Sequence, residues 1–226
     1  MMQVRKALLV AVAMCGLVTL GACSSSSSSS SSDDGTPSTT DPNSLVPTTG
    51  TAPSVTIDTS KKYNATLDTS AGKIVIALDA KSYPKSVNQF VTLANERFYD
   101  GLTFHRVARD FVIQGGDPNG NGTGGPGYGS VVETPANGYQ VGSVAWAKTG
   151  SDPNGAAGSQ FFIVTSDGIN LQQALNTPPY KYGIIGTVTE GLDVAKRIEG
   201  FAPSTGDGAP TSKVTIKKVI ITETPA

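Results

Sequence analysis

Over residues 56–226, hydrophobic and polar positions alternate in short segments, a pattern that predicts mainly β-strands. The stretch "YNATLDTSAGKIVIALD" contains two alternating runs around a turn-like "TSAG", which predicts a hairpin. Further runs rich in β-branched and aromatic residues are bounded by glycine, proline or polar residues: "GLTFHRV", "FVIQGG", "VGSVAWA", "SQFFIVT" and "YGIIGTV". The last segment, "SKVTIKKVIITET", changes parity near Lys217 and Lys218, which predicts a bulge.

Two segments have helical periodicity instead. "PKSVNQFVTLANERF" begins with Pro84, a residue suited to a first helical turn, and spaces its apolar residues at i, i+3, i+4 and i+7. "EGLDVAKRIEG" repeats the helical spacing and stops at Gly200. One early helix, one late helix and about eight strands favour a β-barrel with helical plugs over a βαβ fold.

The N-terminal part of the chain has the features of a signal peptide. The apolar run "ALLVAVAMCGLVTL" follows two basic residues and is shorter than the roughly 20 residues that span a bilayer. The run ends at "LGAC", residues 20–23, which resembles the bacterial lipobox, where cleavage before the cysteine leaves it N-terminal and acylated. We therefore expect a signal peptide over residues 1–22 and an extracytoplasmic protein, lipid-anchored to a bacterial cell membrane through Cys23. The alternative is ordinary secretion without a role for Cys23.

Residues 23–55 are predicted to form a disordered tether. An unbroken serine run is followed by Asp, Thr, Pro and Gly with few large apolar side chains. Such a segment buries too little apolar area to offset the entropy lost on ordering. The folded domain is then residues 56–226. If the signal is removed and Cys23 is lipidated, this domain has no cysteine, and therefore neither disulfide nor thiolate chemistry.

Charge and composition exclude several classes of function. The chain has 17 Lys and Arg residues against 18 Asp and Glu, with no basic stripe, which argues against a nucleic-acid partner. His105 is the only histidine, so a catalytic triad would have to use it, yet no G-x-S-x-G elbow is present. One histidine and scattered carboxylates also provide no metal-ligand cluster. The structural alternative for His105 is a hydrogen-bonded packing residue.

Gly120, Gly122 and Gly125 have the G-x-G-x-x-G spacing of a dinucleotide-binding loop. That fingerprint requires a strand before the glycines and a helix directly after them. Here the glycines continue and lead into "SVVETPANGY", which contains a proline and no helical spacing. The pattern therefore favours a surface loop over a phosphate-binding site.

Strand alternation places Phe104 and Arg106 on one face and His105 on the other. Phe111 and Gln114 have the opposite parity, so a turn or bulge at "ARD" is needed before they can join Arg106. With residues from "VGSVAWAKTGSDPNGAAGSQFFIVT", they would form an open groove with an aromatic floor, one guanidinium and two amides. Such a groove contains no nucleophile and no obvious base.

The blocks "FHRVARDFVIQGGDP", "GTGGPGYG" and "AGSQFFI" resemble the signature motifs of the cyclophilins, a family of peptidyl-prolyl cis–trans isomerases. The resemblance is collinear over residues 64–222. It implies a closed eight-stranded antiparallel β-barrel capped by two α-helices, with the catalytic groove on the outside. It also implies a monomeric catalytic domain without a cofactor that acts on proline-containing polypeptides.

The resemblance also implies a set of site residues. Arg106 matches the catalytic arginine, Phe111 the proline pocket, and Gln114 the residue that binds substrate backbone and orients the arginine. The remaining matches line the substrate groove: His105, Val112, Gly125, Ala145, Trp146, Ala147, Gln160, Phe162, Leu171 and Tyr182.

The sequence departs from the family at several of these positions. Val112 stands where methionine is common, Trp146 where a smaller polar residue is common, and Tyr182 where histidine is common. The tryptophan that usually follows the "FFI" segment has no counterpart, and Leu171 or Leu175 takes its place. That indole holds cyclosporin in the family, so sensitivity to the drug is in doubt while isomerase activity is not.

Two other functions compete with the isomerase. One is a proline-segment binding module or chaperone in which turnover is incidental. The other is inert surface display by the serine tether.

Overall fold

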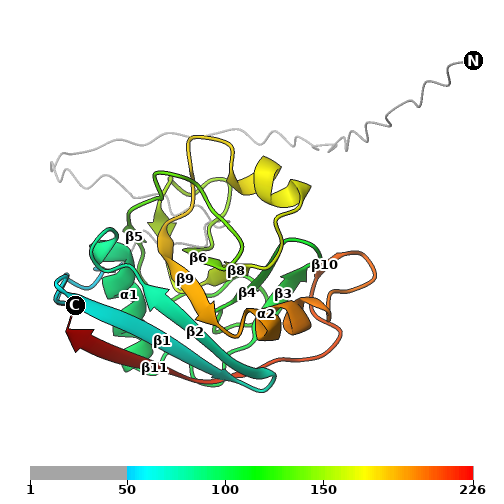
Figure 1. The fold of residues 1–226 in the computed structure, drawn as a ribbon, viewed down its shortest axis with the longest axis horizontal. Helices are drawn as coiled ribbons and strands as arrows, with labels where there is room; N and C mark the ends of the chain where they lie inside the picture. The colour runs from blue at the N-terminus through cyan, green and yellow to red at the C-terminus, as the bar shows by residue number, and fades with distance from the viewer. Residues whose placement is uncertain (1–49, 226) are drawn as a thin grey trace, which may run out of the picture. The chain divides into compact units, whose positions relative to one another are not determined.

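A computed structural model of the chain describes residues 50–225. The predicted signal peptide, Cys23 and the tether up to residue 49 lie outside the described residues. The helices are α1 (Pro84–Asn95) and α2 (Leu192–Glu199), with one π-helical turn, η1 (Leu171–Leu175). The strands, shown in Figure 1, are β1 (Lys61–Thr69), β2 (Gly72–Leu78), β3 (Phe104–Ala108), β4 (Val112–Gly115), β5 (Ser130–Val131), β6 (Ser143–Trp146), β7 (Ala156–Ala157), β8 (Phe161–Val164), β9 (Ile184–Glu190), β10 (Asp207–Gly208) and β11 (Ile216–Pro225).

The main sheet is antiparallel and has the strand order β10-β3-β4-β8-β6-β9-β2-β1-β11. The last strand in this order, β11, lies beside the segment just before β3. Thr103 and Thr215 form an antiparallel bridge there, and Gly101 N donates to Ile216 O at 2.8 Å. Without the short β10, the order contains eight strands, as expected for the cyclophilin fold. Helix α1 packs against β9 and β11, and α2 packs against β2, β3 and β4.

Several local predictions are confirmed. The hairpin turn lies between Thr69 and Gly72, which are cross-strand partners. The register of β1 with β11 shifts so that Asp68 faces Lys218 while Thr69 faces Ile216, leaving Lys217 as the bulged residue. Both predicted helices and all the predicted long strands are present.

The predicted parity of β3 is wrong. Phe104 faces Gly115 while Arg106 faces Gln114, so β3 has one extra residue, His105, in this interval. Because this bulge resets the alternation, Phe104 and Val107 both point into the core, fully buried, whereas Arg106 points outward. The predicted turn at "ARD" is confirmed, because the β3–β4 hairpin turns around Asp110, whose φ is 55°.

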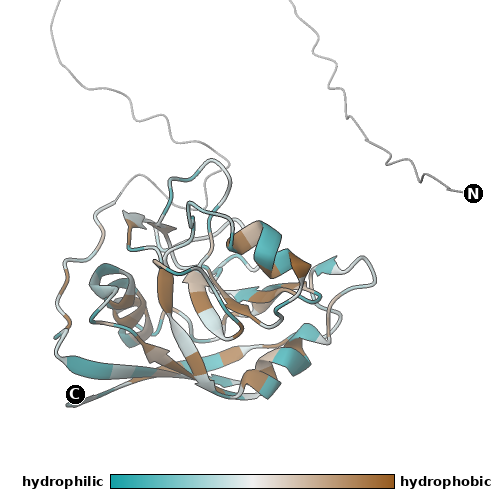
Figure 2. Cartoon of the chain, turned by 45° about the horizontal axis from the view of Figure 1, so that its top comes forward, coloured by the Kyte–Doolittle hydropathy of each residue, from teal (hydrophilic) through white to brown (hydrophobic). Residues whose placement is uncertain are grey.

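The strands carry a different hydrophobic cluster on each face. The inner cluster fills the barrel and includes Phe90, Trp146 and Phe161, with the Phe90 and Phe161 rings 5.8 Å apart in a T-shaped contact. Along the strands and helices of Figure 2, hydrophobic residues alternate with polar ones. The second hydrophobic cluster lies on the other face of the strands, and we call it the outer cluster. It consists of Ala108, Val112, Tyr139, Ala145, Ala147, Phe162, Val164, Leu171, Leu175 and Ile184.

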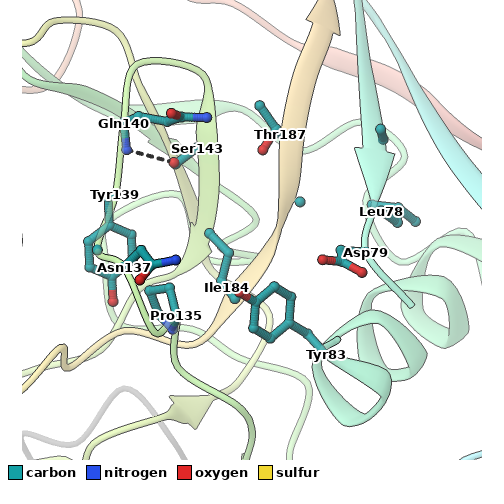
Figure 3. A pocket seen from close by; sticks show the side chains of 13 residues that line it. Leu78, Asp79, Tyr83, Pro135, Asn137, Tyr139, Gln140, Ser143, Ile184 and Thr187 are labelled. Atoms are coloured by element: carbon teal, nitrogen blue, oxygen red, sulfur yellow. Dashed lines mark hydrogen bonds between the residues drawn. The ribbon is translucent and has the colours of Figure 1, made fainter. Parts of the chain in front are cut away.

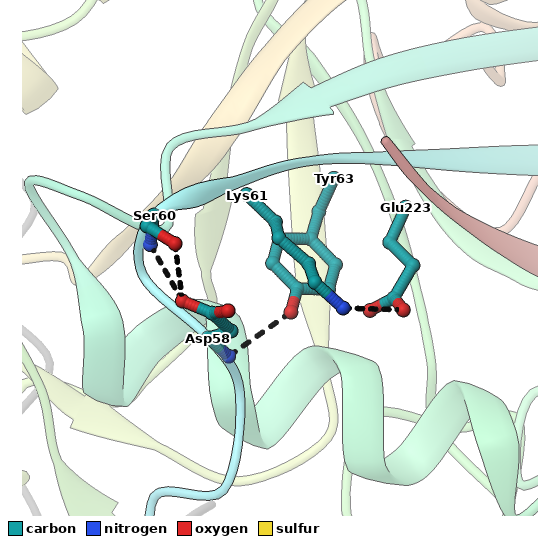
Figure 4. A network of polar contacts seen from close by, with 5 residues as sticks. All are labelled: Asp58, Ser60, Lys61, Tyr63 and Glu223. Carbon is teal, nitrogen blue, oxygen red and sulfur yellow. Dashed lines mark hydrogen bonds and ion pairs between the residues drawn. The ribbon is translucent and has the colours of Figure 1, made fainter. Parts of the chain in front are cut away.

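The beginning of the domain is bound to the barrel through α1. Asn88 of α1 accepts from Thr56 N at 2.8 Å and donates to Ser54 O at 3.0 Å. Asp58 N donates to the Tyr63 hydroxyl at 3.0 Å, as Figure 4 shows. The exposed ion pair between Lys61 and Glu223, also in Figure 4, joins the first strand to the last but adds little stability in water.

Asp117 organises the glycine-rich loop that follows β4. Asp117 is 1% exposed, and its carboxylate accepts backbone N–H bonds from four residues of the loop, Asn119, Asn121, Gly122 and Gly124. Burial raises the pKa of Asp117, but these N–H donors more than offset burial, so the pKa lies below its ordinary value. The loop is therefore held by an ionised carboxylate.

We expect the Asp117 contribution to stability to disappear in acid. Because the folded-state pKa is lowered, the carboxylate stabilises the fold above its unfolded pKa of about 3.9, and this is lost as the pH falls through the folded-state pKa. Asp117→Asn should reduce the free energy of unfolding at pH 7 by about 1–3 kcal/mol, and by less at pH 3. Urea unfolding at both pH values measures the difference, with exposed Asp167→Asn as the control. An Asp117→Asn deficit that is unchanged at pH 3 would contradict this.

We also expect Gly186→Ala to disrupt the contact between β9 and β2. A Cβ at Gly186 would lie 2.1 Å from the carbonyl oxygen of Ala77, a backbone atom that cannot rotate away. The variant should lose about 1–3 kcal/mol of unfolding free energy in a urea titration. Gly150 has no neighbouring atom within 4 Å among the described residues, so Gly150→Ala should change stability by less than about 0.5 kcal/mol. Equal stability of the two variants would show that β2 and β9 are not in such close contact.

Candidate active site

A small pocket of about 80 Å³ lies on the outer face of the barrel. It is bounded by residues of β3, β4 and β8 together with the segments after β6 and β8. The lining residues are Arg106, Phe111, Val112, Gln114, Ala147, Lys148, Phe162, Leu175 and Tyr182. All of them except Lys148 and Leu175 belong to the site implied by the sequence resemblance.

Arg106 provides the only charge on the β3 side of this pocket. Its Nη1 donates to Gln114 Oε1 at 3.0 Å, a contact made possible because the two residues are cross-strand partners. Its Nε and Nη2 donate to the two carboxylate oxygens of Asp207 in β10, at 2.8 and 2.6 Å. The guanidinium is therefore held on two sides before any substrate binds.

A chain of side-chain amides extends from Arg106 to the glycine-rich loop. Gln114 Nε2 donates to Gln160 Oε1 at 3.0 Å, and Gln160 Nε2 donates to Gly124 O at 2.9 Å. Both glutamines are buried, so these bonds fix which end of each amide is the donor. As a result the Gln114 carbonyl oxygen is directed at the arginine.

The floor of the pocket is apolar and packed into the outer cluster. Phe162 and Tyr182 form a T-shaped contact with ring centroids 5.4 Å apart, beside buried Val112. Tyr139 fixes this wall, because its hydroxyl donates to Tyr182 O at 2.6 Å and accepts from Tyr182 N at 2.9 Å. Burial raises the pKa of Tyr139, so its hydroxyl stays protonated as a donor. The pocket suits a small apolar ring.

Of the remaining lining residues, Lys148 was not predicted, and Leu175 was predicted only as the alternative to Leu171 at the position of the missing tryptophan. Lys148 Nζ donates to the carbonyl oxygens of Thr149 and Asp152 at 2.9 and 3.0 Å, and lies 5.6 Å from the centre of the Tyr182 ring. Burial lowers the pKa of Lys148. Leu175, at the end of η1, fills the side of the pocket, while Leu171 is buried in the outer cluster behind it. Nothing in the local pattern around Lys148 indicates that its side chain would turn toward Tyr182.

Trp146 is a correction to the predicted site. Its side chain is fully buried in the inner cluster, its ring centre lies 6.0 Å from that of Phe90, and Nε1 donates to Ser86 Oγ at 2.8 Å. Alternation along β6 explains this, because Trp146 has the parity of Val144, which faces inward, and not of Ala145 and Ala147. The Trp146 side chain therefore does not line the pocket.

The other predicted residues lie around the pocket without lining it. Ala145 is buried in the outer cluster, and Gly125 lies in the loop beside Gly124. His105 lies on the side toward Asp117, and burial lowers its pKa although Asp117 partly opposes this. A neutral His105 outside the pocket gives no reason to assign it a proton transfer.

A larger hollow, shown in Figure 3, lies elsewhere on the barrel and has a volume of about 600 Å³. Its walls come from the end of β2, the residues before α1, the loop of residues 135–140 and β9. Gln140 N donates to Ser143 Oγ at 2.9 Å on one side, and Tyr83 lies near Ile184 on the other. The hollow has no fixed donor comparable to Arg106, so we place the chemistry in the smaller pocket.

Residues 50–225 contain no group of three or more His, Cys, Asp or Glu side chains arranged to hold a metal ion. Within the same residues, no helix has the length and apolar character needed to cross a membrane.

Comparison with known proteins identifies the family. A model of the "Cyclophilin type peptidyl-prolyl cis-trans isomerase/CLD" family matches residues 64–221. Peptidyl-prolyl cis-trans isomerase B of Bacillus subtilis is 44% identical over 128 residues, 56% of this chain and 82% of the Bacillus protein. Peptidyl-prolyl cis-trans isomerase ppi1 of Schizosaccharomyces pombe is 38% identical over 162 residues, 70% of this chain and 97% of the yeast protein.

A solved structure agrees. A cyclophilin type peptidyl-prolyl cis-trans isomerase of Cryptosporidium parvum has a TM-score of 0.62 at 28% identity, covering 73% of this chain and 99% of that chain. The same protein in the presence of the dipeptide Ala-Pro has a TM-score of 0.61, covering 70% and 98%. The chain therefore belongs to the cyclophilin-type peptidyl-prolyl cis–trans isomerases and is an enzyme of this type.

Proposed function

We propose that the enzyme accelerates rotation about X-Pro bonds in exported proteins, and that Cys23 anchors it to the outer face of a bacterial cell membrane. The catalytic part of this proposal rests on one observation. The Arg106 guanidinium is held by Gln114 at the edge of an apolar pocket of about the size of a proline ring. The "LGAC" segment and the serine-rich stretch after it support the membrane part.

The mechanism follows from the electronic structure of the amide. Rotation of an X-Pro bond breaks amide resonance, with a barrier of about 18–20 kcal/mol. As the bond twists, the prolyl nitrogen becomes pyramidal and gains a basic lone pair that the planar ground state lacks. A hydrogen-bond donor at this nitrogen stabilises the twisted state more than the planar state, which is the condition for raising the rate. Arg106 is that donor, because its charge persists at all physiological pH values.

The apolar wall holds one half of the bond while the other half turns. Phe111, Val112 and Phe162 bind the proline ring beside Tyr182, and the residue before proline rotates in the open groove. The structure of the Cryptosporidium relative in the presence of the dipeptide Ala-Pro, which contains such a bond, supports this assignment. No covalent step and no proton transfer is needed.

An isomerase outside the cytoplasm would act where exported chains fold. Uncatalysed X-Pro isomerisation takes tens to hundreds of seconds, slow enough to limit the folding of an exported chain. An enzyme that needs neither ATP nor a cofactor is suited to this compartment.

Replacement of Arg106 tests the mechanism. We expect Arg106→Ala to lower kcat/KM on a proline peptide at least tenfold, because loss of one transition-state donor typically costs about 10²–10³ in rate. Exchange NMR measures turnover and peptide binding in the same sample. Arg197 lies on α2, pairs with Asp193 at 2.7 Å and does not line the pocket, so Arg197→Ala is the matched control. Turnover at the wild-type level in Arg106→Ala would exclude the mechanism, and a cellular role retained by this variant would favour the binding module.

Replacement of Cys23 tests the anchor. We expect Cys23→Ser to move the protein from the membrane fraction to the soluble fraction and to abolish incorporation of a labelled fatty acid. Cys15→Ser is the matched control, since Cys15 belongs to the segment that is removed and its loss should leave both readouts unchanged. A Cys23→Ser protein that stays in the membrane fraction would refute lipid anchoring at this residue.

A further inference from the structure

We propose that Asp207 is a positioning residue for catalysis, which holds the Arg106 guanidinium in the orientation that reaches the prolyl nitrogen. This inference rests on the proposed role of Arg106. Asp207 follows Arg106 by 101 residues, in the loop "PSTGDGAP", and the sequence motifs of the site do not include it.

The two residues make a paired, planar contact. Arg106 Nε donates to Asp207 Oδ1 at 2.8 Å, and Nη2 donates to Oδ2 at 2.6 Å. Two parallel N–H bonds to one carboxylate fix the plane of the guanidinium as well as its distance. A single bond, such as that to Gln114, would leave the plane free to rotate.

The loop that carries Asp207 is itself attached to β3. Asp207 and Gly208 form the short strand β10, which pairs with Ala108 and Val107. Arg109 N also donates to Gly206 O at 2.7 Å. Asp207 is therefore bound to the backbone of the strand that carries Arg106, so the carboxylate and the guanidinium are fixed in one frame.

The stability of the fold does not explain this pair. The side chains of Arg106 and Asp207 are 37% and 51% exposed, and ion pairs at such positions contribute about 0–1 kcal/mol. The carboxylate also offsets part of the arginine charge, which works against stabilising a developing lone pair. We infer that the fixed orientation of the guanidinium outweighs this weaker electrostatic effect.

A count of donors shows what remains for the substrate. The guanidinium has five N–H groups. Asp207 takes one from Nε and one from Nη2, and Gln114 takes one from Nη1. One N–H on each of Nη1 and Nη2 is left, and the substrate meets these two in a fixed plane.

A double-mutant cycle tests the proposal. We expect Asp207→Ala to lower kcat by about three- to tenfold with KM changed less than twofold, because a donor held less precisely loses part of its effect in the transition state. In an Arg106→Ala background, Asp207→Ala should cause no further loss, since Asp207 acts through Arg106. Asp193→Ala removes an exposed carboxylate paired with Arg197 at 2.7 Å and is the matched control.

The outcomes separate the proposals. An equal fold-loss in both backgrounds would show a structural role of β10, and a change in KM alone would show a binding role; either overturns the inference. Unchanged or increased kcat in Asp207→Ala overturns it as well. Retained activity in Arg106→Ala would instead reject the proposed function itself.

A second readout does not depend on activity. In ¹⁵N NMR spectra, the Arg106 Nε–H signal should show slower exchange with water in the wild type than in Asp207→Ala, with Asp193→Ala like the wild type. Asp207→Leu covers the case in which the alanine variant does not fold, because it keeps the approximate side-chain shape and removes both acceptors. An Nε–H signal with the same exchange rate in wild type and Asp207→Leu would overturn the proposal.

Discussion

The register between β3 and β4 is the constraint on which the whole site depends. One extra residue, His105, lies between the pairs Phe104–Gly115 and Arg106–Gln114. In an unbroken ladder, Gln114 would face His105, and Arg106 would face Ile113, whose side chain is fully buried in the barrel. A shift of one residue moves a side chain to the opposite face of a sheet. The bulge therefore keeps Phe104 in the core and still places the arginine outside, beside the amide that orients it.

The same strands serve the core and the site because their two faces are independent. In β8, Phe161 and Ile163 belong to the inner cluster, while Phe162 and Val164 belong to the outer one. A groove floor made of strand residues inherits the rigidity of the hydrogen-bonded sheet. The buried amides of Gln114 and Gln160 extend that rigidity to the glycine-rich loop, and the Asp117 carboxylate fixes the loop from the other side. The glycine-rich loop is thus hydrogen-bonded on both sides at Gly124.

Periodicity was sufficient for the strands, the two helices, the hairpin and the bulge at Lys217, because each leaves a local trace in the sequence. The bulge at His105 leaves no local trace in the sequence, because any residue in an alternating run can be the extra residue of a bulge. Trp146 is different: its parity with Val144 already indicated the interior, and family resemblance alone placed it in the groove. Asp207 and Lys148 leave no local trace. Asp207 reaches Arg106 through the pairing of β10 with β3, and Lys148 reaches the pocket through the loop after β6.

The two sides of the pocket depend on different parts of the chain. The arginine side consists of a hairpin, two buried amides and a carboxylate, all joined by hydrogen bonds. The far side consists of Tyr182, Leu175 and Lys148, which come from connecting segments fastened by Tyr139 and by backbone carbonyls. The departures from the family pattern at Tyr182 and at the missing tryptophan fall on this far side. Substitutions there change the far wall of the pocket, while Arg106 stays held by Gln114 and Asp207. In the proposed mechanism, selectivity for the residues beside proline therefore changes without loss of the donor.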